Sequence, residues 1–300
     1  MKSLKNIPAS VRQRLLNRAK NDKRPFNEIL QYYAMERFLY RLSQSVHADR
    51  FVLKGALMLR AWRSSEFRPT MDIDMLGRTS NEEISIVAQM RGVMTVDVEP
   101  DGLAFDPNSI RAERITEDAD YEGIRVRFCG SLASAKVNMQ VDIGFSDIIY
   151  PCPEELDLPT MLDGPAPRLL CYSRESAIAE KFEVMVKLDI LNSRMKDFYD
   201  IWLLSRQFDF DGAKLTEAIR LTFQRRGTPI PQRVEAFEQS FIAAKQVQWS
   251  AFHKRLQQDY APEAFIDVVS VVKDFLTPPI SSISQGSPQP LRWPASGPWS

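Results

Sequence analysis

The hydrophobic pattern of this chain changes its period once, and this change restricts the fold more than any other feature of the sequence. Between Phe51 and Ile149, short runs of β-type residues alternate with turns and helical stretches. After the proline-rich segment 151–167, apolar residues recur at helical spacing as far as Leu276. The two patterns predict an α+β protein, in which a mixed sheet with flanking helices is followed by an α-helical bundle domain.

The individual elements follow from the same runs of residues. The predicted strands are Phe51–Leu53, Met71–Leu76, Val93–Val98, Ile124–Phe128 and Val137–Phe145. One short helix is predicted between the first two strands, over Ala56–Trp62. The helices predicted for the second part are Ser173–Leu191, Met195–Ser205, Ala213–Phe223, Val234–Ala244 and Ala264–Leu276.

These elements divide the chain into four parts. Residues 1–48 predict N-terminal helices that pack on the core, residues 49–168 the sheet-containing core, and residues 169–277 the helical domain. Residues 278–300 contain six Pro, six Ser and a single charged residue, Arg292. Because such a composition buries too little apolar surface to offset its ordering entropy, we expect the last part to be a disordered tail.

Charge restricts the class of partner. The chain has 39 Lys and Arg and 39 Asp and Glu, so no overall charge attracts it to DNA or to an anionic membrane. Residues 1–50 are locally basic, with 11 Lys and Arg against 4 Asp and Glu, which suits either phosphates or a solvated surface. No apolar run reaches the roughly 18 residues of a spanning helix, and none follows the basic start as in a secretion signal. We therefore expect a cytoplasmic protein with no membrane partner and no specific DNA partner.

The strand that begins at Met71 carries two acids. Residues i and i+2 of a strand face the same side, so Asp72 and Asp74 present carboxylates roughly 6 to 7 Å apart. A divalent cation such as Mg²⁺ or Mn²⁺ would relieve their repulsion, with phosphate oxygens completing its coordination. Gly55 lies upstream, between a predicted strand and a predicted helix, where free N–H groups can hold a phosphate. The alternative is a solvent-facing edge strand with two ordinary acids.

A third acid lies on the polar side of a later strand. In Val137–Phe145, apolar and polar residues alternate, and Asp142 falls on the polar side with Asn138 and Gln140. If this strand pairs beside the first acids, the cluster can bind two metal ions, and one acid can orient or deprotonate an attacking hydroxyl. Taken alone, Asp142 is more typical of an ordinary surface residue, and only the combination of the three acids indicates a site.

The helical part contains a lysine on an apolar stripe. Lys181 lies in the row formed by Ala177, Val184 and Leu188, and a lysine in such a position requires a partner. It can pair with Asp197 or Asp200 of the next predicted helix, or it can meet a triphosphate. A purely structural tie between the two helices remains open, and the two alternatives are compatible.

Taken in order, these motifs resemble the AbiEii/AbiGii toxin family, within the DNA polymerase β-like nucleotidyltransferase superfamily. The resemblance rests on Gly55, Arg68–Asp74, Ala179–Lys181 and Arg194–Asp200, and it extends from about Ile7 to Phe275. It implies a nucleotidyltransferase core with a helical C-terminal domain. It also implies a toxin that is paired with a cognate antitoxin in an abortive-infection or toxin–antitoxin system.

The resemblance assigns roles to individual residues. By it, Asp72 and Asp74 hold the metal ion and Gly55 contacts a nucleotide phosphate. It also implies that Lys181 meets the triphosphate and that Asp200 and Asp197 complete the site from the helical domain. We further expect Asp142 to be a third metal ligand and Arg68 to contact the nucleotide. Two positions depart from the common family pattern: Ala56 stands where a second Gly or a Ser is usual, and Lys196 replaces an Arg and its planar fork. Both departures affect nucleotide affinity and choice more than the reaction class.

The sequence therefore predicts a metal-dependent nucleotidyltransferase that moves a nucleoside monophosphate from an NTP to an acceptor hydroxyl, with tRNA the favoured acceptor. Lys181 would stabilise charge on the departing phosphates, and Asp142 would assist a second metal ion or the nucleophile. Two alternatives remain: a kinase-like phosphotransferase on the same scaffold, and a non-catalytic toxin that acts by binding another protein.

Overall fold

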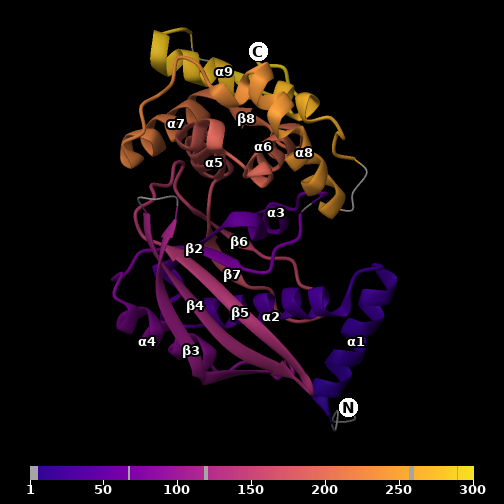
Figure 1. The fold of residues 1–300 in the computed structure, drawn as a ribbon. Helices are drawn as coiled ribbons and strands as arrows, with labels where there is room; N and C mark the ends of the chain where they lie inside the picture. The colour runs from indigo at the N-terminus through magenta and orange to yellow at the C-terminus, as the bar shows by residue number, and fades with distance from the viewer. Residues whose placement is uncertain (1–5, 67, 118–120, 257–259, 289) are drawn as a thin grey trace. The chain divides into compact units, whose positions relative to one another are not determined.

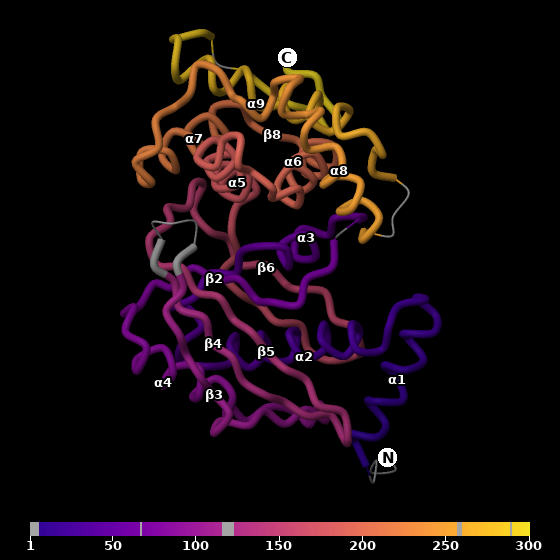
Figure 2. Tube along the Cα trace, viewed as in Figure 1, coloured from indigo at the N-terminus to yellow at the C-terminus, as the bar shows by residue number. Residues whose placement is uncertain are grey.

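The computed structural model describes residues 6–66, 68–117, 121–256, 260–288 and 290–300. The chain divides into two compact units. The first comprises residues 1–146 and 154–171, and the second comprises residues 147–153 and 172–300. The chain passes from one unit to the other after Ser146, after Pro153 and after Cys171 (Figure 2).

The first unit contains a mixed sheet of seven described strands, in the order β3-β4-β5-β2-β1-β7-β6 (Figure 1). The strands are β1 (Phe51–Lys54), β2 (Ile73–Gly77), β3 (Leu103–Glu117), β4 (Tyr121–Leu132), β5 (Ala135–Gly144), β6 (Glu154–Asp157) and β7 (Arg168–Cys171). Strand β2 runs antiparallel to β1 and parallel to β5, and β1 runs parallel to β7. The mixed sheet with flanking helices confirms the predicted fold class.

Helices cover one face of this sheet. The helices of the unit are α1 (Ile7–Asn21), α2 (Phe26–Ser43), α3 (Met58–Ala61) and α4 (Glu83–Met94), with short 3₁₀ helices η1 (Ala48–Arg50) and η2 (Gly55–Leu57). Helix α2 packs on β5, α4 packs on β3, and α1 contacts β4 (Figure 1). The rings of Phe38, Phe105 and Phe128 meet between α2 and the strands, with centroids 5.0 to 5.9 Å apart.

Alternation along the strands leaves the opposite side of the sheet polar. In β4, Ile124, Val126 and Phe128 are buried, whereas Arg127 is exposed and Arg125 is partly exposed. Because successive side chains of a strand point to opposite faces, the apolar set faces the helices and the arginines face away from them. The predicted acids belong to this polar face.

The second unit is built mainly from helices. Its helices are α5 (Arg174–Leu188), α6 (Met195–Gln207), α7 (Gly212–Arg226), α8 (Gln239–Leu256) and α9 (Phe265–Gln285), with 3₁₀ helices η3 (Asp189–Leu191) and η4 (Glu235–Phe237). Strands β8 (Phe210–Asp211) and β9 (Arg292–Trp293) form a two-stranded sheet. Ser173 caps the start of α5 by accepting from the Ser176 N–H, and Asp211 caps α7 by accepting from the Lys214 N–H. Within the described ranges, no helix is both long enough and apolar enough to cross a membrane.

The prediction of a strand over Val93–Val98 was wrong. Val93 and Met94 form the last turn of α4, and no strand is assigned to residues 95–98. The buried residues Ile86, Met90 and Val93 of α4 recur at helical spacing, and this period outweighs the β-type composition of the run. The long strand β3 and the short strands β6 and β7 were not predicted.

The prediction of a disordered tail was also wrong. Helix α9 continues through Pro278 and Pro279 to Gln285, and the chain then returns to form β9. Pro279 has no N–H to donate to the carbonyl of Phe275, and the Trp299 indole N–H donates to that oxygen instead, at 2.9 Å. The two tryptophans and the freed carbonyl together order a segment whose composition suggests disorder.

Trp293 anchors this returning segment. Its side chain is 3% exposed, its indole N–H donates to the Ser205 carbonyl at 2.6 Å, and its ring lies 5.0 Å from that of Phe275. Trp293→Ala should lower the free energy of unfolding by about 3 to 5 kcal/mol because it empties a buried site. Leu291→Ala, at a neighbouring residue that is 75% exposed, should change it by less than about 0.5 kcal/mol. Urea unfolding of both variants tests this, and equal stabilities would contradict the packed tail.

A buried acid in α2 makes stability depend on pH. Burial raises the pKa of Glu36 from 4.5 to about 7, although the Met161 N–H and Arg37 act in the opposite direction. The folded protein therefore keeps this proton to a higher pH than the unfolded chain does. The stabilising contribution is complete below about pH 4.5 and is lost as the pH rises through about 7.

Replacing Glu36 with glutamine, which does not titrate, should remove this contribution to the pH dependence of stability. Between pH 5 and pH 8, Glu36→Gln should gain stability relative to the parent protein by up to about 3 kcal/mol. Urea unfolding of both proteins at each pH measures the difference. A difference that stays constant across this range would show that Glu36 does not titrate as described.

Candidate active site

The three predicted acids of the first unit lie on neighbouring strands. Asp72 directly precedes β2, and Asp74 is the second residue of that strand. Strand β5 pairs with β2 in parallel, and in this register Asp74 is directly opposite Asp142. Adjacent strands are about 4.8 Å apart, so the pairing places Asp74 and Asp142 side by side. Asp72 lies two residues before Asp74 in the chain.

These acids are part of a row of charged residues that crosses five strands. Lys54 of β1 is opposite Asp74, Asp142 is opposite Arg125 of β4, and Arg125 is opposite Glu113 of β3. We call Lys54, Asp74, Asp142, Arg125 and Glu113 the charged row. Directly opposed residues share one face of a sheet, so a cation stands on each side of the two adjacent acids.

The contact between Arg125 and Asp142 is bidentate. Arg125 Nε donates to Asp142 Oδ1 at 2.8 Å, and Nη2 donates to Oδ2 at 2.7 Å. The amide of Gln140 donates to Oδ2 at 3.3 Å. These hydrogen bonds to Asp142 raise the pKa of Arg125 above its ordinary value. Each oxygen of Asp142 therefore already accepts a hydrogen bond from the sheet itself.

Gly55 is required because the Asp74 carboxylate lies against it. The backbone of Gly55 has φ +74°, and a Cβ built on it would lie 1.9 Å from Asp74 Oδ2. The helix predicted over Ala56–Trp62 is present over Gly55–Ala61, as the three-residue η2 followed by the four-residue α3. Contact between Gly55 and a nucleotide phosphate stays a prediction.

Helix α2 holds the backbone that leads into the acids. The Gln31 amide donates to the Met71 carbonyl and to the Asn138 carbonyl, each at 3.1 Å. The Tyr32 hydroxyl accepts from the Thr70 N–H at 3.0 Å. Arg68 is partly exposed in the irregular segment that precedes these residues. The start of β2 and the middle of β5 are thus fixed to the same buried helix.

The remaining candidates form a group of their own in the second unit. Lys181 Nζ of α5 lies 2.9 Å from Asp200 Oδ2 and 3.4 Å from Asp197 Oδ1 of α6. Arg194 Nε lies 2.7 Å from Asp197 Oδ2. Both aspartates are buried, and Lys181 keeps part of its side chain exposed. The structure thus brings Lys181, Asp197 and Asp200 together within the helical unit, as it brings Asp72, Asp74, Asp142 and Gly55 together within the first unit.

Electrostatics keeps Asp197 ionised. Burial on its own would raise the pKa of this carboxyl, but Lys181 and Arg194 outweigh burial, and the pKa lies below its ordinary value. An ionised and buried aspartate in turn requires a nearby cation. The structural tie between α5 and α6 is therefore present, and Lys181 is held with its amine beside two carboxylates.

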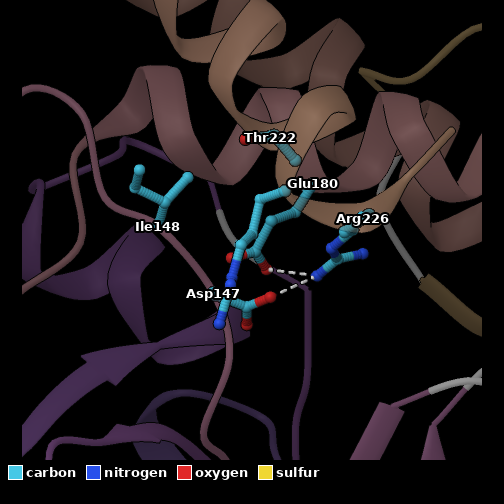
Figure 3. A pocket seen from close by; sticks show the side chains of 6 residues that line it. Asp147, Ile148, Glu180, Thr222 and Arg226 are labelled. Carbon is cyan, nitrogen blue, oxygen red and sulfur yellow. Dashed lines mark hydrogen bonds and ion pairs between the residues drawn. The ribbon is translucent and has the colours of Figure 1, made fainter. Parts of the chain in front are cut away.

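A second buried network fixes the other side of α5 (Figure 3). Arg226 of α7 lies 2.7 Å from Asp147, 2.8 Å from Glu183 and 3.7 Å from Glu180. The Tyr172 hydroxyl donates to Glu180. Because Glu180 and Glu183 are bound to α7 while Lys181 is bound to α6, helix α5 cannot rotate without breaking buried ion pairs.

The network borders a small pocket, which Figure 3 shows from close by. The lining residues are Asp147, Ile148, Glu180, Thr222, Arg225 and Arg226, and they enclose no room for a molecule even as small as water. This pocket therefore does not fit an NTP. We assign it no ligand.

The donor set of the first unit suits a divalent metal ion in part. Asp72 and Asp74 offer the carboxylate oxygens that Mg²⁺ prefers, and Mg²⁺ commonly uses one or two carboxylates together with substrate phosphates. Across the described ranges, however, no three Asp, Glu, His or Cys side chains are placed to share a metal ion. Asp142 faces Arg125 instead. The residues therefore fit a metal held by Asp72 and Asp74 with a nucleotide.

Sequence reasoning missed Lys54 and Arg125. Arg125 alternates with apolar neighbours in the predicted strand Ile124–Phe128, and Lys54 directly follows the predicted strand Phe51–Leu53. Their place beside the acids depends on which strands pair and in which register. That information is not carried by either segment alone.

Comparison with known proteins identifies relatives of the chain. Residues 37–271 match a family model described as nucleotidyl transferase AbiEii toxin, type IV TA system, which confirms the resemblance based on the motifs. The fold is similar to that of MenT4, a nucleotidyltransferase toxin from Mycobacterium tuberculosis H37Rv, at 18% identity and a TM-score of 0.51, covering 88% of this chain and 98% of that one.

Two further solved structures are similar at lower scores. One is a putative nucleotidyltransferase from H. pylori, with 12% identity, a TM-score of 0.48 and coverage of 86% of this chain and 98% of that one. The other is JHP933 from Helicobacter pylori, with 12% identity, a TM-score of 0.49 and coverage of 86% and 95%. No curated protein gives a significant match.

The contact between Gly55 and Asp74 can be tested by adding one methyl group. Gly55→Ala combines a positive φ, which costs roughly 1 to 2 kcal/mol, with a collision that costs roughly 1 to 3 kcal/mol more. Gly227→Ala is the matched control, because Gly227 has φ +65° and no atom within 4 Å of its added Cβ. Urea unfolding should show the larger loss for Gly55→Ala. Equal losses would mean that Asp74 does not lie against Gly55.

Proposed function

Because the chain belongs to the AbiEii family of nucleotidyltransferase toxins of type IV toxin–antitoxin systems, we propose that Asp72 and Asp74 hold the divalent metal ion of its reaction. The metal is Mg²⁺ or Mn²⁺ in this proposal, and the substrate is an NTP. The observation that carries it is the register of β2 and β5, which sets Asp74 opposite Asp142 with Asp72 two residues earlier. The family also implies an antitoxin partner.

The proposed reaction transfers a nucleoside monophosphate. The acceptor hydroxyl oxygen attacks the α-phosphorus, the bond to the bridging oxygen of pyrophosphate breaks, and the hydroxyl proton passes to a carboxylate. In this proposal, Asp142 accepts that proton or orients the hydroxyl. The bound metal ion would neutralise phosphate charge and polarise the phosphoryl group. Gly55 and Arg68 are assigned to the nucleotide phosphates.

Lys181 is the cation assigned to the leaving group in this proposal. Lys181 carries a positive charge that can stabilise the departing pyrophosphate. Asp197 and Asp200 hold its amine through two contacts, so the amine is oriented before a nucleotide arrives. The short distance from Nζ to Asp200 supports a fixed rather than a mobile lysine.

We propose RNA as the acceptor, with tRNA favoured. The basic residues of α1 support the binding of a polyanion such as RNA, since Arg14 and Lys20 are exposed on that helix. Several of the basic side chains already have acidic partners: Arg14 lies 2.8 Å from Asp163, and Arg18 lies 3.1 Å from Asp22. Binding of RNA should weaken steeply as salt is raised. A flat response to salt would favour a protein acceptor.

One experiment separates the candidate reactions. The purified protein is incubated with total cellular RNA and an NTP labelled at the α- or the γ-phosphate. Label from the α-phosphate on RNA supports the proposal, and label on protein would change only the acceptor. Label from the γ-phosphate would indicate a kinase-like reaction, and no transfer of either label would indicate a non-catalytic toxin.

The same assay tests the acids. Replacing a residue that only hydrogen-bonds to a metal ligand commonly lowers activity about 10- to 100-fold. Removing both ligands, as in the Asp72→Ala/Asp74→Ala double variant, should therefore lower the transfer of α-label by more than about 100-fold. The control is Glu154→Ala/Asp157→Ala, which removes two exposed acids of β6 in the same unit. Transfer that survives the first double change would overturn the assignment of Asp72 and Asp74.

A further inference from the structure

We propose that Arg125 is a positioning residue that keeps Asp142 out of the coordination sphere of the metal ion, so that Asp72 and Asp74 are the metal's protein ligands. This inference rests on the proposed function. It gives Asp142 a separate task, that of a carboxylate held in place beside the metal for the acceptor hydroxyl. Arg125 acts through Asp142 and touches no substrate in this proposal.

The first support is the geometry of the contact. Each oxygen of Asp142 accepts one hydrogen bond from the Arg125 fork, at 2.8 and 2.7 Å. Parallel hydrogen bonds between a guanidinium and a carboxylate are among the strongest and most directional in proteins. A metal ion that bound either oxygen would have to compete with this fork and with the amide of Gln140.

The second support is burial. Asp142 is 7% exposed, whereas the side chain of Arg125 is 30% exposed. A carboxylate that is so far removed from water needs a charge partner at all times, including when neither metal nor nucleotide is bound. Arg125 provides that partner from the sheet, on the side of Asp142 away from Asp74.

The third support is the pattern of the neighbours. Asp74 lies opposite Asp142 on one side and repels it, while Arg125 lies opposite on the other side and attracts it. Both forces draw the Asp142 carboxylate towards Arg125 and away from Asp74. In agreement, no three metal-ligating side chains of the described ranges are placed to share an ion, although three acids lie on adjacent strands.

Arg127 offers a matched control two residues along the same face of β4. Its hydrogen bonds go to Glu113 and to Gln140, at 2.5 and 3.2 Å. It is also more exposed than Arg125. Arg125→Gln and Arg127→Gln therefore remove the same charge from the same strand, and the first of them frees Asp142.

The test measures Mn²⁺ binding by electron paramagnetic resonance, without NTP or acceptor. Arg125→Gln should bind Mn²⁺ about 10-fold more tightly than the parent, since it unmasks a carboxylate and removes a repelling cation. Arg127→Gln should bind as the parent does. Asp142→Asn should weaken binding by well under about 10-fold, because it removes a neighbouring negative charge but no ligand. Adding Asp142→Asn to Arg125→Gln should abolish the gain. Arg125→Lys, a less disruptive variant, should give an intermediate affinity because one ammonium cannot hold both oxygens.

Kinetics gives a second measurement on the same variants. Arg125→Gln should lower kcat for α-label transfer and leave the KM for NTP nearly unchanged, because Asp72 and Asp74 are intact. A residue that served only to stabilise the sheet would lower the unfolding midpoint without this separation of kcat from KM.

The results that would contradict the inference differ from the result that would contradict the proposed function. If Asp142→Asn weakens Mn²⁺ binding in the parent protein by 10-fold or more, Asp142 is a metal ligand and the inference is overturned, while the proposed function stands. If Arg125→Gln binds Mn²⁺ as the parent does, the inference is likewise overturned. If Asp72→Ala/Asp74→Ala also leaves Mn²⁺ binding unchanged, the metal site of the proposed function fails, and the inference fails with it.

Discussion

Repulsion between two neighbouring carboxylates is the constraint around which the sheet of the first unit is arranged. Asp74 and Asp142 stand opposite each other on parallel strands, and Asp142 is nearly buried. Acids in such positions persist only where cations offset them. The charged row provides Lys54 on one side and Arg125 on the other, so the sheet offsets the charge of its acids with its own residues.

The helical unit follows the same rule with different residues. Lys181 lies between two buried aspartates, and Arg226 lies among three acids on α5 and on the segment after β5. Breaking a buried pair by removing one partner costs about 3 to 5 kcal/mol, so these networks restrict α5 to one orientation. A helix restricted in this way holds its lysine at a fixed place within the helical unit.

Much of the local structure could be predicted from the sequence. The strand Val137–Phe145, the helix that carries Lys181 and the family itself followed from alternation, from helical spacing and from the order of the motifs. The errors arose where local composition and tertiary contacts disagree. Val93–Val98 has a β-type composition, but its first residues complete a buried helical face. The proline-rich tail is ordered because an indole N–H satisfies the carbonyl that Pro279 leaves free.

The sequence by itself determined which residues are available for chemistry: two acids at strand spacing, a third on a polar strand face, and a lysine on an apolar helical stripe. Only the tertiary structure decided how their charges are compensated. Strand register set Arg125 opposite Asp142 and Lys54 opposite Asp74, although these residues are 17 and 20 positions apart. The physical reason is that period and propensity act over a few residues, whereas electrostatic compensation depends on distances in space.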